Sequence, residues 1–198
     1  MNPLENIFGT NIILENERVL LRPLQPDDIL QFSKIAFEPE IWAYLTNLIR
    51  NEEDLNLLIE QTAADKKRGF RYPFTIEDKF SANIAGSTSY GNISPQDNRL
   101  EIGWTWLGKD FMGTGLNNNC KYLLLQYAFE NLGCERVEFK TDVLNKRSRQ
   151  ALKKIGAAEE GILRSHMLMH GGRRRDSVYY SILKNEWEEV KKKLALII

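Results

Sequence analysis

The sequence contains few of the residues that bind metals or cross-link a chain. Its 198 residues include two cysteines, Cys120 and Cys134, and two histidines. Two cysteines make no disulfide framework, and no Cys/His cluster has the ligand spacing of a zinc site. We therefore expect no metal. Cys120 lies on the apolar face of a predicted helix, so we interpret it as a small core residue.

The chain also lacks a net charge and a long apolar run. Lys plus Arg and Asp plus Glu each total 27, so net charge offers no general reason to bind nucleic acid or a membrane surface. The N-terminus has no basic region followed by an apolar segment, and no run approaches the ~20 apolar residues of a membrane span. We expect a cytoplasmic protein without a membrane partner, folded as one domain over residues 1–198.

Apolar periodicity predicts alternating strands and helices behind a loosely attached lead at residues 1–16. Strands are predicted at residues 18–24, 70–77, 84–92, 100–107, 136–143, 157–169 and 177–183. Helices are predicted at residues 27–37, 51–68, 116–131, 145–155 and 185–196. The third helix is a crossover, so the strands before and after it should be parallel, whereas short-linked strands should be antiparallel. The fold class is therefore α/β, with a central twisted mixed sheet of about six to seven strands flanked by helices.

A glycine-rich turn between a strand and a helix is the clearest functional signal. Gly113, Thr114 and Gly115 follow the aromatic strand and precede the third helix. Glycines let the backbone come close to a ligand, and the N–H groups of a first helical turn lack intrahelical partners. The turn predicts a phosphate or pyrophosphate site, although an ordinary strand–helix junction would also use these glycines. No Gly-Lys-Ser/Thr and no third glycine follow, which excludes a Walker loop and a dinucleotide fingerprint.

Four segments carry a family resemblance. They are RVLLRPLQPDD from Arg18, EIGW from Glu101, MGTGLN from Met112 and NKRSRQALKKIGA from Asn145. In this order they resemble the GNAT family of acyl-CoA-dependent N-acetyltransferases, most closely its RimJ/RimL-like branch of ribosomal-protein N-terminal acetyltransferases. The resemblance covers nearly the whole chain. It implies the GNAT fold and the direct attack of a primary amine on the thioester of acetyl-CoA.

The resemblance also implies where acetyl-CoA would bind. Backbone N–H groups of the glycine turn would hold the pyrophosphate, and the end of the aromatic strand would hydrogen-bond the pantetheine arm. The expected cofactor-binding residues are Trp104, Thr105, Trp106, Met112, Gly113, Thr114, Gly115, Leu116, Asn117, Asn145 and Arg147. Trp104 and Trp106 would equally suit a core, and helix capping alone would account for Asn145. Lys146, Arg147 and Lys109 are candidates for contact with the terminal phosphate of CoA.

Two residues are candidates for catalysis. The resemblance places Glu101 beside the acetyl group, where it would accept a proton from an ammonium whose pKa is ~10. The alternative is a rim carboxylate paired with a surface cation. Ser148 is the candidate for protonating or hydrogen-bonding the leaving sulfur, or else a first-turn serine satisfied by Asn145.

Two positions depart from the family pattern. Asp110 stands where many members have Gln or Arg, three residues before the first loop glycine. Leu152 stands where many members have a tyrosine that acts as general acid. Both departures favour an alternative function, a non-catalytic acyl-CoA-binding sensor or partner-binding module.

The sequence does not decide the identity of the acceptor amine, which is either a protein or peptide N-terminus or a small amine. Residues 41–48 and 171–175 should frame its site, and their few acids disfavour a polycation. Arg173, Arg174 and Arg175 indicate either a solvated turn or recognition of an acidic peptide or an RNA-rich partner such as a ribosome. Nucleic acid is otherwise not expected. The C-terminal helix either packs in cis or pairs with a second subunit, so a homodimer also stays open.

Overall fold

A computed structural model describes residues 2–198, which form one mixed eight-stranded sheet in the order β1-β2-β3-β4-β5-β6-β8-β7. The strands are β1 (Leu14–Glu15), β2 (Val19–Pro23), β3 (Arg71–Asp78), β4 (Asn83–Ser94), β5 (Arg99–Leu107), β6 (Arg136–Asp142), β7 (Ala158–Leu168) and β8 (Arg174–Leu183). Only the β5–β6 pair among them is parallel. The expected mixed sheet is confirmed, and the additional strand is β1, which is too short to produce a sequence pattern.

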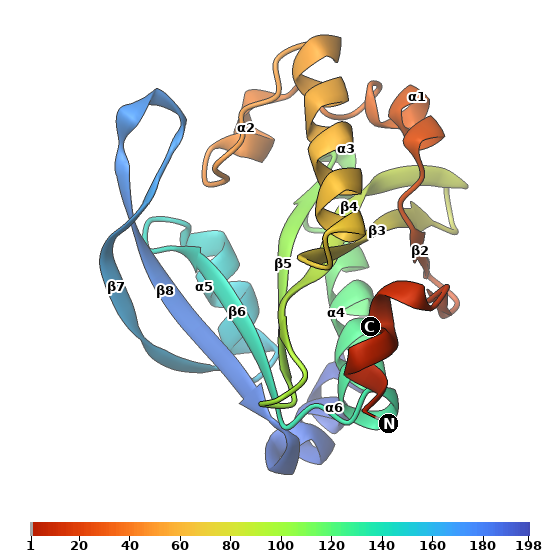
Figure 1. Cartoon of the computed structure of the whole chain (residues 1–198), viewed down its shortest axis with the longest axis vertical. Helices are drawn as coiled ribbons and strands as arrows, with labels where there is room; N and C mark the ends of the chain where they lie inside the picture. The colour runs from red at the N-terminus through yellow and green to blue at the C-terminus, as the bar shows by residue number, and fades with distance from the viewer. Residues whose placement is uncertain (1) are drawn as a thin grey trace.

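Helices cover both faces of this sheet (Figure 1). They are α1 (Ile29–Phe32), α2 (Pro39–Trp42), α3 (Glu52–Lys67), α4 (Leu116–Gln126), α5 (Lys146–Lys154) and α6 (Trp187–Ala195). In Figure 1, α3 lies in front of the sheet, and α4 and α5 lie behind it. The predicted helix at 27–37 is wrong in length, because a 3₁₀ turn at Pro26–Asp28 precedes a single turn of α1. None of the helices in residues 2–198 has the length and apolarity needed to cross a bilayer.

Two hydrophobic clusters lie on opposite faces of the sheet. The larger cluster packs the apolar face of α4, including the buried Cys120, against inward-facing strand residues such as Ile102 and Phe139. The smaller cluster packs α1–α3 against the other face, where Trp106 contacts Phe32 and Trp42 at centroid distances of 5.1 and 5.3 Å. The central strands of the sheet are therefore buried on both sides, as expected for a layered α/β domain, whereas the edge strand β7 is largely exposed.

The two chain ends pack against the body of the protein. The predicted loose lead is wrong, because Leu4, Ile7 and Ile12 are buried in the larger cluster. The Ile12 N–H also donates to the hydroxyl of Tyr72 at 3.0 Å. The C-terminal helix packs in cis, since Trp187 of α6 stacks on Phe129 at 5.4 Å.

The parallel pair is short, and this shortness creates the functional site. β5 and β6 pair only at Arg99–Arg136, Leu100–Val137 and Glu101–Glu138. Beyond Glu101 the two strands diverge. A bulge in β5 accompanies the divergence. It is marked by a shift of the β4–β5 register between Ser87 and Ser89 and by a φ of 51° at Trp104. Bulges bend a strand, so the bulge directs the end of β5 away from β6.

Candidate active site

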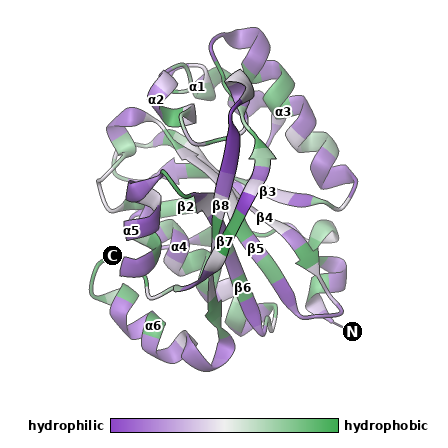
Figure 2. Cartoon of the chain, turned by 90° about the vertical axis from the view of Figure 1, so that its left-hand side faces the viewer, coloured by the Kyte–Doolittle hydropathy of each residue, from purple (hydrophilic) through white to green (hydrophobic). Residues whose placement is uncertain are grey.

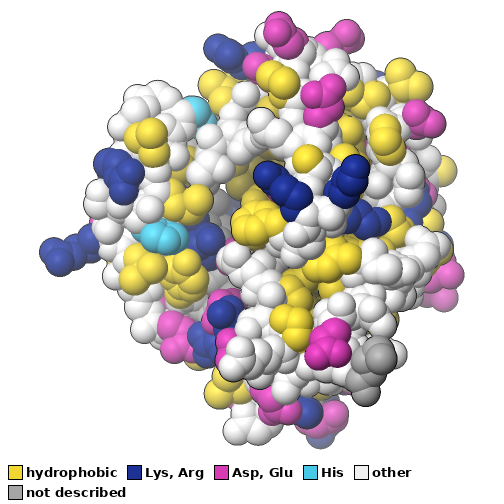
Figure 3. Space-filling model, viewed as in Figure 1, with side chains coloured by type: hydrophobic (Ala, Val, Ile, Leu, Met, Phe, Trp, Pro, Cys, Tyr) yellow, Lys and Arg dark blue, Asp and Glu magenta, His cyan; other side chains and the backbone are white. Residues whose placement is uncertain are grey.

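A cleft of about 390 Å³ opens where β5 and β6 diverge. Its walls come from β5, from the loop and first turns of α4, from β6 and from α5, and residues from α2 and β8 close the mouth. Figure 3 shows the surface hollowed between the β7–β8 hairpin and the α3 side of the molecule. The expected residues that line the cleft are Trp104, Thr105, Trp106, Met112, Gly113, Gly115, Asn117, Asn145, Arg147 and Ser148.

The β5 wall combines a packed face with an exposed backbone. The ring of Trp104 crosses β4 at Gly91, where an added Cβ would lie 2.3 Å from the indole. Trp106 is 6% exposed within its aromatic cluster, so it is a core residue as well as part of the wall. Thr105 faces the other side of the sheet and shares a hydrogen bond of 2.8 Å with Thr88. Past Glu101, no β6 residue is paired with the backbone of β5.

The glycine loop has the geometry of an anion site. Gly113 and Gly115 have φ values of 78° and 85°, and no atom lies within 4 Å of a Cβ built on either one. No described residue accepts a hydrogen bond from the N–H groups of Gly113, Thr114 and Gly115. Gly115 is the N-cap of α4, so these groups lie at the positive end of the helix dipole.

Two backbone donors expected in this loop are not free. The N–H of Met112 donates to the carbonyl of Lys109 at 3.1 Å, within a 3₁₀ turn that also holds the exposed Asp110. The N–H of Leu116 faces the hydroxyl of Thr114 at 3.5 Å, and the Leu116 side chain is buried in the core. The Met112 N–H is therefore engaged within the turn, and the binding of pyrophosphate by the N–H groups of residues 112–116 stays a prediction.

The start of α5 forms the opposite wall. Asn145 caps this helix, as predicted, by accepting the N–H of Ser148 at 3.0 Å. Arg147 spans the cleft and donates to the sulfur of Met112 at 3.0 Å, so it joins α5 to the glycine loop. Leu152 is buried and presents an apolar surface to the cleft.

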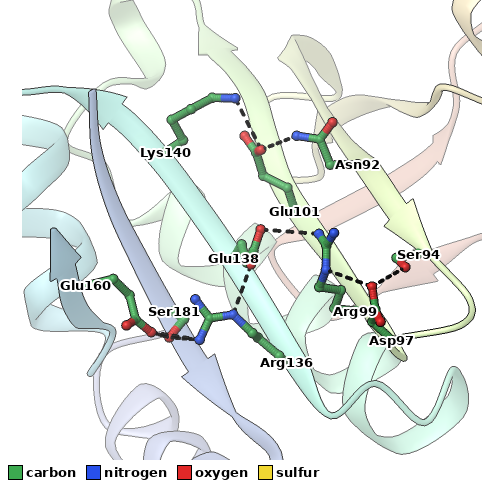
Figure 4. Close-up of polar contacts among 10 residues, drawn as sticks. All are labelled: Asn92, Ser94, Asp97, Arg99, Glu101, Arg136, Glu138, Lys140, Glu160 and Ser181. Atoms are coloured by element: carbon green, nitrogen blue, oxygen red, sulfur yellow. Dashed lines mark hydrogen bonds and ion pairs between the residues drawn. The ribbon is translucent and has the colours of Figure 1, made fainter. Parts of the chain in front are cut away.

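Glu101 is not itself among the residues that line the cleft, but it contacts two that are, Gly103 and Lys140, and Figure 4 shows its contact with Lys140. It is 2% exposed, accepts a hydrogen bond of 2.6 Å from Asn92, and lies 3.4 Å from the ammonium of Lys140. The reading of Glu101 as a rim carboxylate is wrong, because both the carboxylate and its cationic partner are largely buried. A buried carboxylate next to a cleft is suited to proton transfer.

Two segments, residues 42–44 and 170–175, meet at the mouth of the cleft, and their role in framing an amine site stays a prediction. Arg175 is buried and donates to the carbonyl of Tyr44 at 3.3 Å, and His170 donates to the carbonyl of Trp42 at 3.1 Å. Arg173 pairs with the buried Asp142. The solvated-turn interpretation is therefore wrong for the buried Arg175, whereas Arg173 is exposed although it pairs with Asp142. Figure 2 shows that the start of β8 is hydrophilic.

The β6–β8 side of the cleft is cationic. Lys140 and Arg175 line it, and the ring of His166 lies beside them with Nδ1 3.0 Å from the hydroxyl of Ser177. Burial, followed by the charges of Lys140 and Arg175, lowers the pKa of His166. Among residues 2–198, no group of three or more His, Cys, Asp or Glu side chains is arranged to hold a metal ion.

Lys121 is a cleft residue that the sequence pattern did not single out. It extends from α4 and is 7% exposed, and its ammonium donates to the hydroxyl of Thr105 at 3.3 Å. The sequence did contain one signal that could have identified Lys121. It is a charged residue one turn after Asn117, on a helix whose other inward residues are mostly apolar.

Comparisons with known proteins agree with this geometry. Residues 18–158 match the family described as Acetyltransferase (GNAT) domain. The chain is 30% identical over 179 residues to YdaF of Bacillus subtilis (strain 168), a candidate ribosomal N-acetyltransferase, covering 87% of this chain and 95% of that one. A candidate acetyltransferase from T. thermophilus has a similar crystal structure, with a TM-score of 0.85, 36% identity and coverage of 94% and 97%. Mycobacterium smegmatis RimJ, solved in complex with CoA-disulfide, shares the fold with a TM-score of 0.77, 22% identity and coverage of 94% and 93%.

Proposed function

The chain belongs to the GNAT acetyltransferase family and is an N-acetyltransferase, and we propose that it transfers acetyl from acetyl-CoA to the primary amine of a peptide N-terminus, with a small amine as the second candidate. The observation that carries this proposal is the cleft between β5 and β6. It has free backbone donors at the glycine loop, and the buried carboxylate of Glu101 lies beside its lining residue Lys140.

The residues present fit acetyl-CoA. The free N–H groups of the glycine loop and the N-terminus of α4 would bind the pyrophosphate. The backbone of Trp104–Trp106, which has no β6 partner, would hydrogen-bond the amides of the pantetheine arm. Asn117, Asn145 and Arg147 line the same cleft, and Arg147, which contacts Met112 of the glycine loop, would bind the phosphates.

Glu101 would carry out the deprotonation of the acceptor. A primary ammonium has a pKa of ~10, so it must lose a proton before it can attack the thioester. The carboxylate, or a water that it holds, would accept this proton beside the cleft. Ser148 lines the cleft from α5, where its hydroxyl would hydrogen-bond the sulfur.

The charges around the acceptor side favour a peptide over a polyamine. Lys140, Arg175 and His166 lie close to the buried carboxylate of Glu101, and the other buried carboxylate nearby, Asp142, is paired with Arg173, so a substrate with several positive charges would find few free acids. The name of the Bacillus subtilis relative also refers to ribosomal acetylation. A short peptide presents one amine and a neutral backbone, which the carbonyls and amides at the mouth would complement.

The non-catalytic alternative rests on Leu152 and Asp110. Leu152 removes the acid that many relatives place there, and Asp110 adds a negative charge near the phosphate site. A sensor would bind acetyl-CoA without turnover, so binding and turnover must be measured separately.

The test is calorimetric titration of acetyl-CoA into the protein, with ADP and NAD as controls, followed by acetylation assays that detect released CoA. We expect selective binding of acetyl-CoA and faster transfer to peptides than to spermidine. Binding without transfer to any amine would support the sensor. Absence of binding by the folded protein would refute the proposal.

A further inference from the structure

Lys121 and Glu101 approach the gap between β5 and β6 from opposite faces of the sheet. Successive residues of a strand point to opposite faces. On β6, Lys140 contacts Glu101, whereas the adjacent Phe139 packs beneath the ammonium of Lys121 with the nitrogen 5.4 Å from the ring centroid. The gap therefore has a carboxylate on the acceptor face and an ammonium on the α4 face.

The ammonium of Lys121 is buried without a counter-ion. Its residue is 7% exposed, and within the described part of the chain no carboxylate oxygen lies within 4.0 Å of the nitrogen. Its partners are the hydroxyl of Thr105 and the ring of Phe139. Removing a cation from water is costly unless a partner compensates, so an unpaired ammonium that lines a cavity indicates a ligand with negative charge.

A second unsatisfied group lies one turn earlier on α4. The side-chain oxygen of Asn117 is buried and has no hydrogen-bond partner among residues 2–198. Asn117 and Lys121 both line the cleft, and residues four apart on a helix share one face. This face of α4 therefore presents to the gap an acceptor without a hydrogen-bond donor and a cation without a counter-ion.

We propose that Lys121 protonates the sulfur of the leaving CoA. This inference rests on the proposed function and supplies the acid that Leu152 cannot provide. The lone pair of the neutral amine forms the N–C bond with the acetyl carbon, and the C–S bond breaks with its electron pair staying on sulfur. A proton passes from the Lys121 ammonium to that sulfur, the amine's proton leaves on the Glu101 side, and Lys121 regains a proton from water.

The acidity of Lys121 suits this role. Burial lowers its pKa to about 8, and the nearby Cys120 on its own helix and Glu101 on β5 act in the opposite direction. A thiol has a reference pKa of ~8.5, so proton transfer between the two groups is nearly balanced.

The test compares the binding of CoA with that of desulfo-CoA, which lacks the sulfur, in the wild type and in Lys121→Met. We expect the substitution to weaken CoA binding about fivefold near pH 8, where the thiol and the Lys121 ammonium titrate together and share a proton, and to leave desulfo-CoA binding unchanged. Thiolate absorbance should show a lowered thiol pKa in the wild-type complex and an ordinary one in the variant. Equal loss of both ligands, or no loss of either, would overturn the assignment.

Turnover supplies a second readout. The wild-type rate should fall at high pH as Lys121 loses its proton, and Lys121→Met should lower kcat about 100-fold and remove this basic limb. Lys121→Arg keeps a positive charge but holds its proton, so it should restore CoA binding but not kcat. If the proposed acetyl-transfer function were wrong, the wild-type protein itself would not bind CoA. That outcome is distinct from a failure of the Lys121 assignment, in which the wild type binds CoA normally.

Discussion

The carboxylate of Glu101 folds back over Gly103, two residues further along β5. A Cβ built on residue 103 would lie 2.9 Å from Oε1 of Glu101, closer than real Cβ contacts allow. The glycine of the EIGW segment therefore makes room for the carboxylate, which gives this spacing a physical reason beyond strand geometry.

Gly103→Ala should displace the Glu101 carboxylate without disturbing the glycine loop. We expect kcat to fall about tenfold, the scale of a misplaced catalytic group, with acetyl-CoA affinity little changed. Steady-state kinetics and calorimetry measure the two effects. Gly9→Ala is the control, because nothing lies within 4 Å of a Cβ there. An unchanged kcat would remove the proposed link between this glycine and Glu101.

Glu101→Gln should lower kcat/KM by about 10²–10³ for every amine, because an amide cannot accept the proton. Acetyl-CoA binding should persist, since the glycine loop is untouched. Glu138→Gln is a matched control, because Glu138 pairs with Glu101 in register and contacts Arg99 and Arg136 instead of the cleft (Figure 4). Similar losses in both variants would argue against a catalytic role for Glu101.

Gly115→Ala and Gly133→Ala should separate strain from ligand binding. Both glycines have positive φ, 85° and 69°, and neither has an atom within 4 Å of a built Cβ. Each substitution should cost about 1 kcal/mol of stability, seen in thermal unfolding. Only Gly115→Ala should weaken acetyl-CoA binding, by about tenfold, because its backbone faces the proposed pyrophosphate site. If both variants bound acetyl-CoA with equal affinity, the phosphate would have to bind somewhere other than this loop.

Asp110→Asn should strengthen acetyl-CoA binding about two- to fivefold at low salt, because it removes a negative charge near the proposed phosphate site. Salt screens exposed charges, so the gain should shrink as ionic strength rises. Calorimetry at two salt concentrations measures both effects. Glu5→Gln, which removes a charge from the N-terminal 3₁₀ helix, serves as the control. Weaker binding by Asp110→Asn would show that Asp110 assists the ligand.

Asp28→Asn should destabilise the fold by about 2 kcal/mol at neutral pH. Burial opposes ionisation of Asp28, but hydrogen bonds from Arg22, Thr75 and the N–H of Gln25 outweigh it, so its pKa lies below the ordinary 3.8. A lowered folded pKa adds stability above that ordinary value, and the addition is lost as pH falls through the folded pKa. In urea unfolding, the difference in the free energy of unfolding between wild type and variant should therefore shrink as the pH falls below 3.8. A constant gap would mean that charge is not the cause.

Local chemistry in the sequence determined the main elements. Asn51 and Asn145 accept N–H groups of the helices that follow them, and glycine marks both ends of the functional loop, because caps and turns depend on neighbouring residues only. The family resemblance added the order of the strands and located Glu101 and the glycine loop. These parts of the fold and site were predictable because their signals span a few residues.

The tertiary structure alone decided the rest. The burial of Lys121 depends on how α4 lies under the gap between two strands, and the role of Arg175 depends on a contact with Tyr44, 131 residues away. The packing of the N-terminal lead and the pairing of Glu101 with Lys140 are also contacts between distant segments. A charged side chain has the same sequence signature in solvent and in a cleft, and only the position of its distant neighbours sets its desolvation, its partners and its chemistry.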